Sequence, residues 1–356
     1  MATIYDVAKA AGVSPKTVSR VLNGDAPVNE KTRAAVNAAM ASLNYVRSNA
    51  ARTMRSRRSG LVGLITGAIS ATPEALEPAG LPDILIVQGA QRTFAEAGMT
   101  LLITDVGRSA ERVPEMVQTF LEHQVEGLIY VAEYHQKITL PPVLAGRPVV
   151  LANCFDDAGT PAVVPDDRQG EFDLVKGLIE RGHRRIGFLT LPVEQVARGL
   201  RLEGYRAAHQ EAGIDVDEAL IEPGALIDIQ HEYDRLPAAL DRILAQRPAP
   251  TAICCGNDKM AMRVYALLRE RGIDIPSQIS VVGYDDYLMI TQQLHPTLTS
   301  TRLPYRGLGS RAAERLLQLV AGGKDPGEAP IESVSGPVAW RESVQVLETQ
   351  SPATTP

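Results

Sequence analysis

The chain has 356 residues, of which 45% are hydrophobic and 4% aromatic, and its formal net charge is −6 at pH 7. This length suits two or three domains with a sizeable core, and the composition suits helix-rich α/β layers. No apolar window approaches the ~20 residues that span a bilayer, and the N-terminus lacks the apolar core of a secretory signal. We therefore expect a cytoplasmic protein with no membrane partner.

The charge is distributed unevenly along the chain. Residues 1–58 contain ten Lys or Arg and three Asp or Glu, a net charge of +7, whereas the remainder carries −13. A basic module joined to an acidic body is expected when only the module touches phosphates, although a basic terminus can also arise by chance.

Three cysteines, Cys154, Cys254 and Cys255, have neither the spacing of a disulfide framework nor that of a metal site. The adjacent pair closes the apolar run TAICC, which favours buried thiols over redox chemistry. We expect a reducing compartment, no metal and no cofactor.

The N-terminal segment predicts two short helices joined by a tight turn. Thr3 with Asp6 three residues later resembles a capping box at the start of the first helix, which Gly12 ends. Ser14 and Pro15 are suited to the N-cap and first position of a second helix.

A third amphipathic helix is predicted over residues 29–45, with Val36, Ala39, Met40 and Leu43 facing inward. It completes the three-helix core that a helix-turn-helix domain needs. A generic helical hairpin with a solvated basic face would explain the first two helices but not this third one.

The free face of the second helix carries Lys16, Thr17 and Arg20 near its N-terminal end, where a recognition helix meets base edges. Arg can bind guanine O6 and N7 with two hydrogen bonds, whereas Lys reaches the same acceptors less selectively. This face is therefore a candidate DNA interface.

From residue 61 onward, short apolar runs alternate with amphipathic helices. The expected strands are LVGLI, TLLIT, GLIYV, PVVLA, RRIGFLT, TAICC and ISVVGYD. Near-continuous apolar strands separated by helices indicate parallel sheets covered on both faces, here in two doubly wound subdomains.

Ligands of such folds bind beyond the carboxyl ends of the strands. Asp258 follows the run TAICC, where its carboxylate can accept from two hydroxyls, and Arg201 begins the helix after RRIGFLT, where it can donate in a fork. A structural salt bridge or a helix cap is the alternative role for each.

The segments YDVAKAAGVSPKTVSRVLNG and EKTRAAVNAAMASLNYV resemble the DNA-binding headpiece of the lactose-repressor (LacI/GalR) family of bacterial transcription regulators. GHRRIGFL, RLEGYRAA, CGNDKMAM, IPSQISVVGYDD and HPTLTS follow in the order and spacing of that family's effector-binding core. The resemblance implies an α/β protein with an N-terminal all-α helix-turn-helix headpiece and a periplasmic-binding-protein-like core of two doubly wound parallel α/β subdomains.

The resemblance also implies the domain bounds. We expect a headpiece at 1–46, a hinge helix or linker at 47–59, a core N-subdomain at 60–163 with 291–320, a core C-subdomain at 164–290 with 321–345, and a flexible tail at 346–356. The tail carries no Leu heptad, so the tetramerising helices of the lactose repressor have no counterpart and a homodimer is expected.

The hinge segment has few apolar residues, so we expect it to be disordered off DNA. The resemblance implies that it folds on the operator and wedges Met54, where the family usually has Leu, into the minor groove. Arg47 stands where many relatives have Pro, and an ordinary basic linker is the alternative. The segment Glu74–Leu81 looks like an insertion at a strand-end loop of the effector cleft.

Site residues carried over by the resemblance form three sets. Base or groove contacts are expected from Pro15, Lys16, Thr17, Arg20 and Met54, and backbone contacts from Tyr5, Ser14, Ser19, Asn23 and Arg52. Arg201 and Asp258 match the principal effector positions, and Asn153 matches a third, where relatives often have Asp. Further effector candidates are Phe155, Arg198, His231 and Asp285.

These expectations describe a ligand-responsive DNA-binding regulator. The main hypothesis is a repressor of carbohydrate-utilisation genes that binds a near-palindromic double-stranded operator as a dimer and is released by a sugar-type effector between the subdomains. The alternative is a co-repressor-dependent regulator that senses a nucleobase or another metabolite. A doubly wound enzyme is a remote alternative, because G-x-G-x-x-G, G-x-x-x-x-G-K-[ST] and G-x-S-x-G are absent from the sequence.

Overall fold

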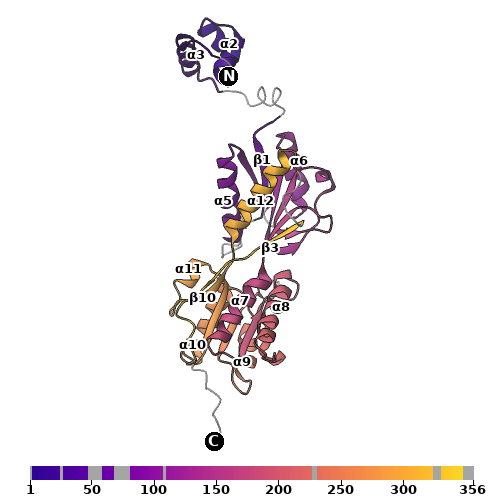
Figure 1. Cartoon of the computed structure of the whole chain (residues 1–356), viewed down its shortest axis with the longest axis vertical. Helices are drawn as coiled ribbons and strands as arrows, with labels where there is room; N and C mark the ends of the chain where they lie inside the picture. The colour runs from indigo at the N-terminus through magenta and orange to yellow at the C-terminus, as the bar shows by residue number, and fades with distance from the viewer. Residues whose placement is uncertain are drawn as a thin grey trace. The chain divides into compact units, whose positions relative to one another are not determined.

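A computed structural model describes residues 2–24, 27–46, 58–67, 81–106, 110–226, 231–323 and 330–347. The chain forms two compact units, Met1–Ser59 and Gly60–Pro356 (Figure 1). Within the described ranges, no helix is long and apolar enough to cross a membrane. Residues 47–57 of the expected hinge and residues 74–80 of the expected insertion lie outside these ranges.

The described residues of the first unit form three helices. They are α1 (Ile4–Ala10), α2 (Pro15–Asn23) and α3 (Glu30–Ser42). The capping box is confirmed, because the Asp6 carboxylate accepts from the Thr3 amide and the Asp6 amide donates to the Thr3 hydroxyl. The second start signal is confirmed too, since the Ser14 hydroxyl accepts from the Thr17 amide ahead of Pro15.

One apolar cluster holds these helices together. Val7, Val18 and Val36, one from each helix, are fully buried in it. The third helix ends at Ser42 rather than at residue 45, because the backbone of Asn44 turns into the left-handed region at φ 45°. The three-helix core is therefore formed, with a shorter final helix than the sequence pattern predicts.

The second unit is built on two six-stranded sheets. The first sheet has the order β11-β5-β4-β3-β1-β2 and the second the order β12-β10-β9-β8-β6-β7. All neighbouring strands are parallel except β10 and β12, which pair antiparallel.

The strands of the first sheet are β1 (Leu61–Thr66), β2 (Thr100–Asp105), β3 (Leu128–Lys137), β4 (Val149–Phe155), β5 (Ala162–Pro165) and β11 (Ile331–Val334). Those of the second are β6 (Ile186–Thr190), β7 (Ile221–Pro223), β8 (Ala252–Cys255), β9 (Ser280–Asp285), β10 (Thr299–Arg302) and β12 (Val338–Ala339). All seven apolar runs form strands, which confirms the doubly wound parallel fold. The other five strands have two to four residues each, too few for a periodic apolar signal.

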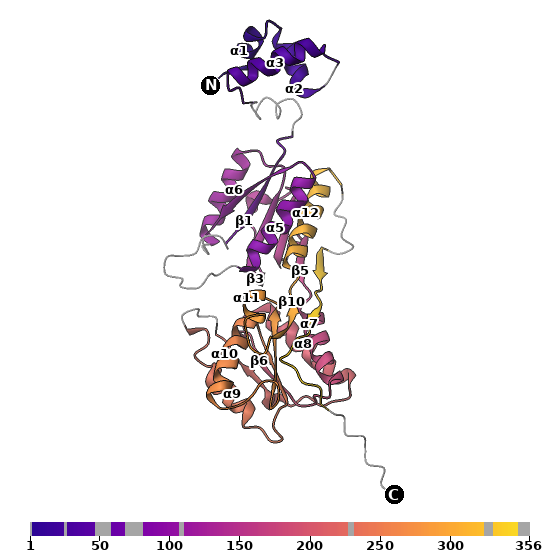
Figure 2. The ribbon, with the colours of Figure 1, turned by 90° about the vertical axis from the view of Figure 1, so that its left-hand side faces the viewer.

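Helices cover both faces of each sheet. On the first sheet, α5 (Leu81–Glu96) and α12 (Tyr305–Val320) pack on one face and α6 (Val113–Glu122) on the other. On the second, α7 (Asp167–Glu180) and α8 (Val196–Glu211) oppose α9 (Leu236–Leu244) and α10 (Asp258–Glu270). Figure 2 shows α5 beside α12 and α7 beside α8. The remaining short elements are η1 (Ala110–Arg112), η2 (Pro142–Leu144), η3 (Glu218–Leu220) and α11 (Leu288–Thr291).

The strand order corrects the expected division of the C-terminal part. β10 lies in the second sheet, although residues 291–320 are expected in the first subdomain. β11 lies in the first sheet, although residues 321–345 are expected in the second. The chain thus passes between the sheets after β5, β10 and β11. Polar strands such as TSTR and IESV carry no sequence signal for the sheet with which they pair.

The contact between α5 and α12 depends on glycine. A methyl group on Gly309 would overlap the carbonyl oxygen of Ile86, and one on Gly89 would overlap that of Arg306. Each helix therefore has a glycine where the backbone of the other comes closest. In contrast, Gly199 in α8 is exposed and has no atom near its missing side chain.

We expect Gly309→Ala to lower the free energy of unfolding of the second unit by about 1–3 kcal/mol, because the two helices must separate to admit the methyl group. Gly199→Ala is the matched control and should raise that free energy by about 0.5–1 kcal/mol, since Ala loses less backbone entropy in a helix. Chemical denaturation of the full chain measures both. A Gly309→Ala protein as stable as the wild type would contradict the packing.

Candidate functional site

The DNA face expected on α2 is accessible in the first unit. Lys16 and Arg20 are exposed, while Pro15, Thr17 and Ser19 are half-buried. Tyr5 on α1 is 70% exposed and lies outside the apolar cluster of the three helices. The side chain of Asn23 and all of Arg52 and Met54 lie outside the described residues.

Arg201 is the centre of the second unit's site. The sequence pattern predicts it at the start of a helix, but it is the sixth residue of α8, because α8 begins at Val196. Its side chain is 4% exposed, yet each of its donor nitrogens has an acceptor in the chain. Nε and Nη2 contact Asp167 Oδ1 at 2.8 and 2.7 Å, and Nη1 donates to the carbonyl of Gly256. The guanidinium also stacks at 3.5 Å from the ring centre of Tyr284. A buried guanidinium is stable only with such a complete set of partners.

Asp167 connects this arginine to the first sheet. Its second carboxylate oxygen lies 2.8 Å from Nδ1 of His135, which is on β3 and 6% exposed. Burial alone would raise the pKa of Asp167, but the charge of Arg201 and the hydrogen bond from His135 outweigh it and hold that pKa below its usual range. The carboxylate is therefore charged, and it joins α7 of the second sheet to β3 of the first.

Asp258 is occupied by the protein itself. It is 1% exposed, and its two oxygens accept from the hydroxyl of Ser300 and the amide of Tyr287, each at 2.7 Å. The N-cap of α10 is its neighbour Asn257, whose Oδ1 accepts from the Met260 amide at 2.7 Å. Asn257 is half-buried, and among the described residues no acceptor pairs with its Nδ2.

Asp285 ends β9 with a backbone φ of 119°, a conformation that costs a non-glycine residue energy. Desolvation raises its pKa to about 7, and the nearby charges of Arg201 and Lys259 act in the opposite direction. Strain combined with a displaced pKa is typical of ligand-binding positions.

The remaining effector candidates differ in their surroundings. Asn153 is buried on β4 at φ 60°, and its Nδ2 donates to the carbonyl of Ala132. Phe155 on β4 meets the His135 ring edge to face at 5.8 Å between centres. Arg198 donates to the Thr190 hydroxyl at 3.3 Å. His231 is exposed and contacts Asp234 at 2.8 Å.

The structure thus brings Arg201 and Asp285 together, and through His135 it connects them to Phe155. Sequence reasoning missed His135, Asp167 and Asn257. Asn257 had a usable signal, because it lies between the apolar run TAICC and Asp258. Asp167 follows β5, a four-residue strand that the sequence pattern does not predict. His135 had no such signal, since it lies in an extension of β3 beyond the apolar run.

Glu171 lies one turn after Asp167 on α7 and is 1% exposed. Its Oε1 has no hydrogen-bond partner in the part of the chain that the structure describes. Burial raises the pKa of Glu171 to about 8, against the opposing charge of Arg201. The side chain is therefore largely protonated at neutral pH.

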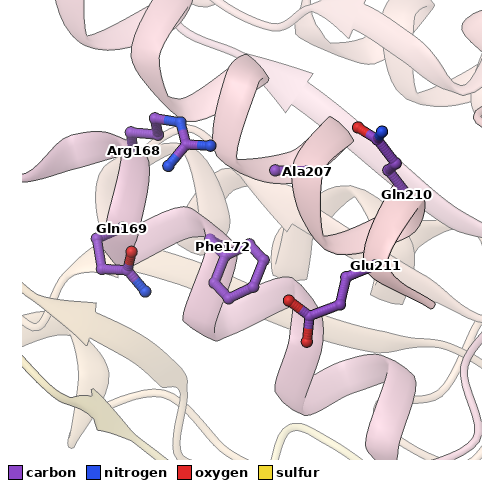
Figure 3. A pocket seen from close by; sticks show the side chains of 6 residues that line it. All are labelled: Arg168, Gln169, Phe172, Ala207, Gln210 and Glu211. Carbon is purple, nitrogen blue, oxygen red and sulfur yellow. The ribbon is translucent and has the colours of Figure 1, made fainter.

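An open hollow of about 510 Å³ lies on the outer side of α7 and α8 (Figure 3). Its lining residues are Arg168, Gln169, Phe172, Ala207, Gln210 and Glu211. None of the expected effector residues is among them. The hollow is thus separate from the Arg201 cluster, although the same two helices form both.

The raised pKa of Glu171 predicts that the stability of the folded chain depends on pH. Between about pH 4.5 and pH 8 the folded chain holds a proton that the unfolded chain has released, so stability falls as pH rises through that window and levels off above it. The Gln side chain of Glu171→Gln has no proton to lose. The free energy of unfolding of this variant should therefore rise relative to that of the wild type by at most about 1.4 kcal/mol for each pH unit through that window.

Urea denaturation at pH 5, 6, 7 and 8 measures this difference. Glu203→Gln, which alters an exposed Glu on α8, is the matched control and should follow the wild-type curve. If the free energies of unfolding of Glu171→Gln and the wild type change with pH in parallel, Glu171 is ionised throughout this pH range.

The chain is similar to known proteins over almost its whole length. Residues 3–48 match the family of bacterial regulatory proteins, lacI family, and residues 175–344 match the periplasmic binding protein-like domain. The sucrose operon repressor of Escherichia coli is 30% identical over 91% of this chain and 96% of its own length. The ribose operon repressor of Escherichia coli (strain K12) is 32% identical over 90% of this chain and 93% of its own length.

Two solved structures extend the likeness to the fold. The lac repressor dimer bound to operator and the anti-inducer ONPF is 27% identical with a TM-score of 0.79, covering 97% of this chain and 99% of that one. The complex of the transcriptional regulator CelR with cellobiose is 30% identical with a TM-score of 0.65, covering 96% and 100%. The chain belongs to the lacI family of bacterial regulatory proteins and is a ligand-responsive DNA-binding transcription regulator.

Proposed function

We propose that two copies of this chain repress transcription by binding a near-palindromic operator, and that a sugar-type effector releases them. The observation that carries the proposal is the combination, in one chain, of an exposed Lys16 and Arg20 on a capped recognition helix with a buried arginine cluster at strand ends. The protein acts in the cytoplasm, where its DNA target is, and it is not an enzyme.

The DNA part of the proposal is supported by charge and symmetry. The net charge of +7 in residues 1–58 matches a phosphate-binding module on an acidic body. A two-fold symmetric dimer presents two recognition helices to two half-sites of a palindrome. In this proposal residues 1–46 are the headpiece and residues 47–59 the hinge, from which Met54 enters the minor groove and Arg52 contacts the backbone.

The effector part is supported by the chemistry of the cluster and by relatives. Asp285, Asn257 and Arg198 offer acceptors and donors next to Arg201, and Phe155 offers a ring face, which together suit a polyhydroxylated ring. Similar chains include repressors named for the sucrose and ribose operons and a regulator solved with cellobiose. Binding at the cluster controls the operator only if the effector prefers one of the protein's two states.

Arg20→Ala should lower affinity for the operator in the protein's own upstream DNA by about 1–3 kcal/mol while leaving non-specific binding nearly unchanged, because a base contact is lost. Arg33→Ala, the same change on the exposed face of α3, should not alter the ratio of specific to non-specific affinity. Fluorescence anisotropy at one fixed salt concentration measures both ratios. An equal loss of both affinities for Arg20→Ala would exclude base recognition by that residue.

Asn257→Ser should weaken effector binding about five- to tenfold, because Ser retains the N-cap acceptor for the Met260 amide but removes the amide donor. The control is Asn29→Ser, which makes the same change at the N-cap of α3. Calorimetric titration with the effector that releases the operator measures the affinities. If Asn257→Ser binds that effector as tightly as the wild type, Asn257 is not a ligand.

A further inference from the structure

The charge of Arg201 is already neutralised within the chain. Two of its donor nitrogens contact Asp167 Oδ1 at 2.7 and 2.8 Å, and both side chains are at most 5% exposed. In sites that bind phosphate or carboxylate, a guanidinium of this kind meets the ligand's anion with paired hydrogen bonds. Here Asp167 occupies the place that such an anion would take.

The partners of Asp167 make it hard to displace. His135 holds its second oxygen at 2.8 Å from the side of the first sheet, and Asp167 also forms the first residue of α7, where the helix dipole favours a negative charge. Removing one member of a buried pair leaves the other charge uncompensated, which is costly. An anionic ligand would therefore have to approach a carboxylate that stays in position.

Asp285 adds to this exclusion when it is ionised, because it lies close enough to Arg201 for the two charges to interact. Glu171, on the same face of α7 as Asp167, is largely protonated at neutral pH and contributes no charge. The charge of Lys259 also acts on Asp285. Arg198 on α8 donates to a neutral group, the Thr190 hydroxyl.

Hydroxyl groups suit such a site better than anions do. A hydroxyl donates to a carboxylate and accepts from an amide, so it can bond Asp285 and Asn257 without adding a charge. The cost of bringing a like charge next to buried carboxylates is avoided.

On the basis of the function proposed above, we infer that the effector is an uncharged polyhydroxylated molecule, without phosphate or carboxylate groups, and that Asp167 sets this preference. A ligand anion is rejected because Asp167 already satisfies Arg201. Neutral hydroxyls are accepted because they leave that ion pair in place.

Calorimetric titration of the full chain with matched pairs tests the inference. Suitable pairs are D-ribose with ribose 5-phosphate, D-fructose with fructose 6-phosphate, and D-galactose with galacturonate. The wild type should bind the uncharged member of at least one pair about tenfold or more tightly than its charged partner. Tighter binding of a charged member would overturn the inference but leave the proposed function standing.

Asp167→Asn should reduce that preference about tenfold or invert it, because Arg201 is then left without a counter-charge. Asp166→Asn is the matched control. Asp166 is the N-cap of α7 and accepts from the Gln169 amide, a role that Asn also fills, so the preference should stay unchanged. An equal change in both variants would show that Asp167 does not set the preference.

Arg201→Gln gives a second test if Asp167→Asn fails to fold. It leaves the charge of Asp167 uncompensated and should strengthen the rejection of the charged member. An unchanged ratio of the affinities for the uncharged and charged members would show that Asp167 does not set the preference. Binding of neither member of any pair, together with operator affinity that none of them alters, would overturn the proposed sugar effector and the inference with it. These outcomes separate the two claims.

Discussion

The burial of one guanidinium organises the second unit. Arg201 is 4% exposed, and a charge so far from water is stable only when its donors are satisfied and its charge is balanced. The chain meets that demand from several directions: a carboxylate at the start of α7, a carbonyl after β8 and an aromatic ring at the end of β9. The carbonyl and the ring come together because β8 and β9 are parallel strands of the second sheet that end at the same edge, whereas α7 follows β5 of the first sheet.

The need to balance the buried charge of Arg201 also connects the two sheets. Asp167 can balance Arg201 only while it is itself held, and part of that hold comes from His135 on β3 of the first sheet. A ligand that changes the surroundings of Arg201 therefore acts on a contact that spans both sheets. This is the kind of two-sided contact through which binding at one site can favour one arrangement of a protein over another.

Much of the fold follows from the sequence, whereas the site follows only in part. Helix starts at Thr3 and Ser14 and the seven apolar strands are determined by neighbouring residues, so local patterns predict them. β10 and β11 are set by pairing with distant strands, and their own residues do not reveal the partner. The site shows the same limit: the sequence places Arg201 on the helix after β6, but its ion pair with Asp167 joins residues 34 positions apart, and the contact of Asp167 with His135 joins residues 32 positions apart.

Asp258 illustrates why position alone does not assign a role. It lies directly after a buried strand, as a ligand-binding carboxylate would, but Ser300 and Tyr287 already use both of its oxygens. One residue earlier, Asn257 keeps an amide donor and a half-buried position. The sequence predicts that both residues lie at the edge of the sheet. Only the packing around each side chain shows that Asp258 has a structural role and that Asn257 is accessible.

If effector and operator act on one equilibrium of this chain, their effects on each other's binding must be reciprocal, and that reciprocity can be measured directly. Operator affinity is measured by fluorescence anisotropy with and without a saturating sugar, and sugar affinity by calorimetry with and without saturating operator, all at one salt concentration. We predict that the sugar lowers operator affinity by the same factor by which the operator lowers sugar affinity. Operator affinity that stays unchanged when the sugar is bound would contradict it.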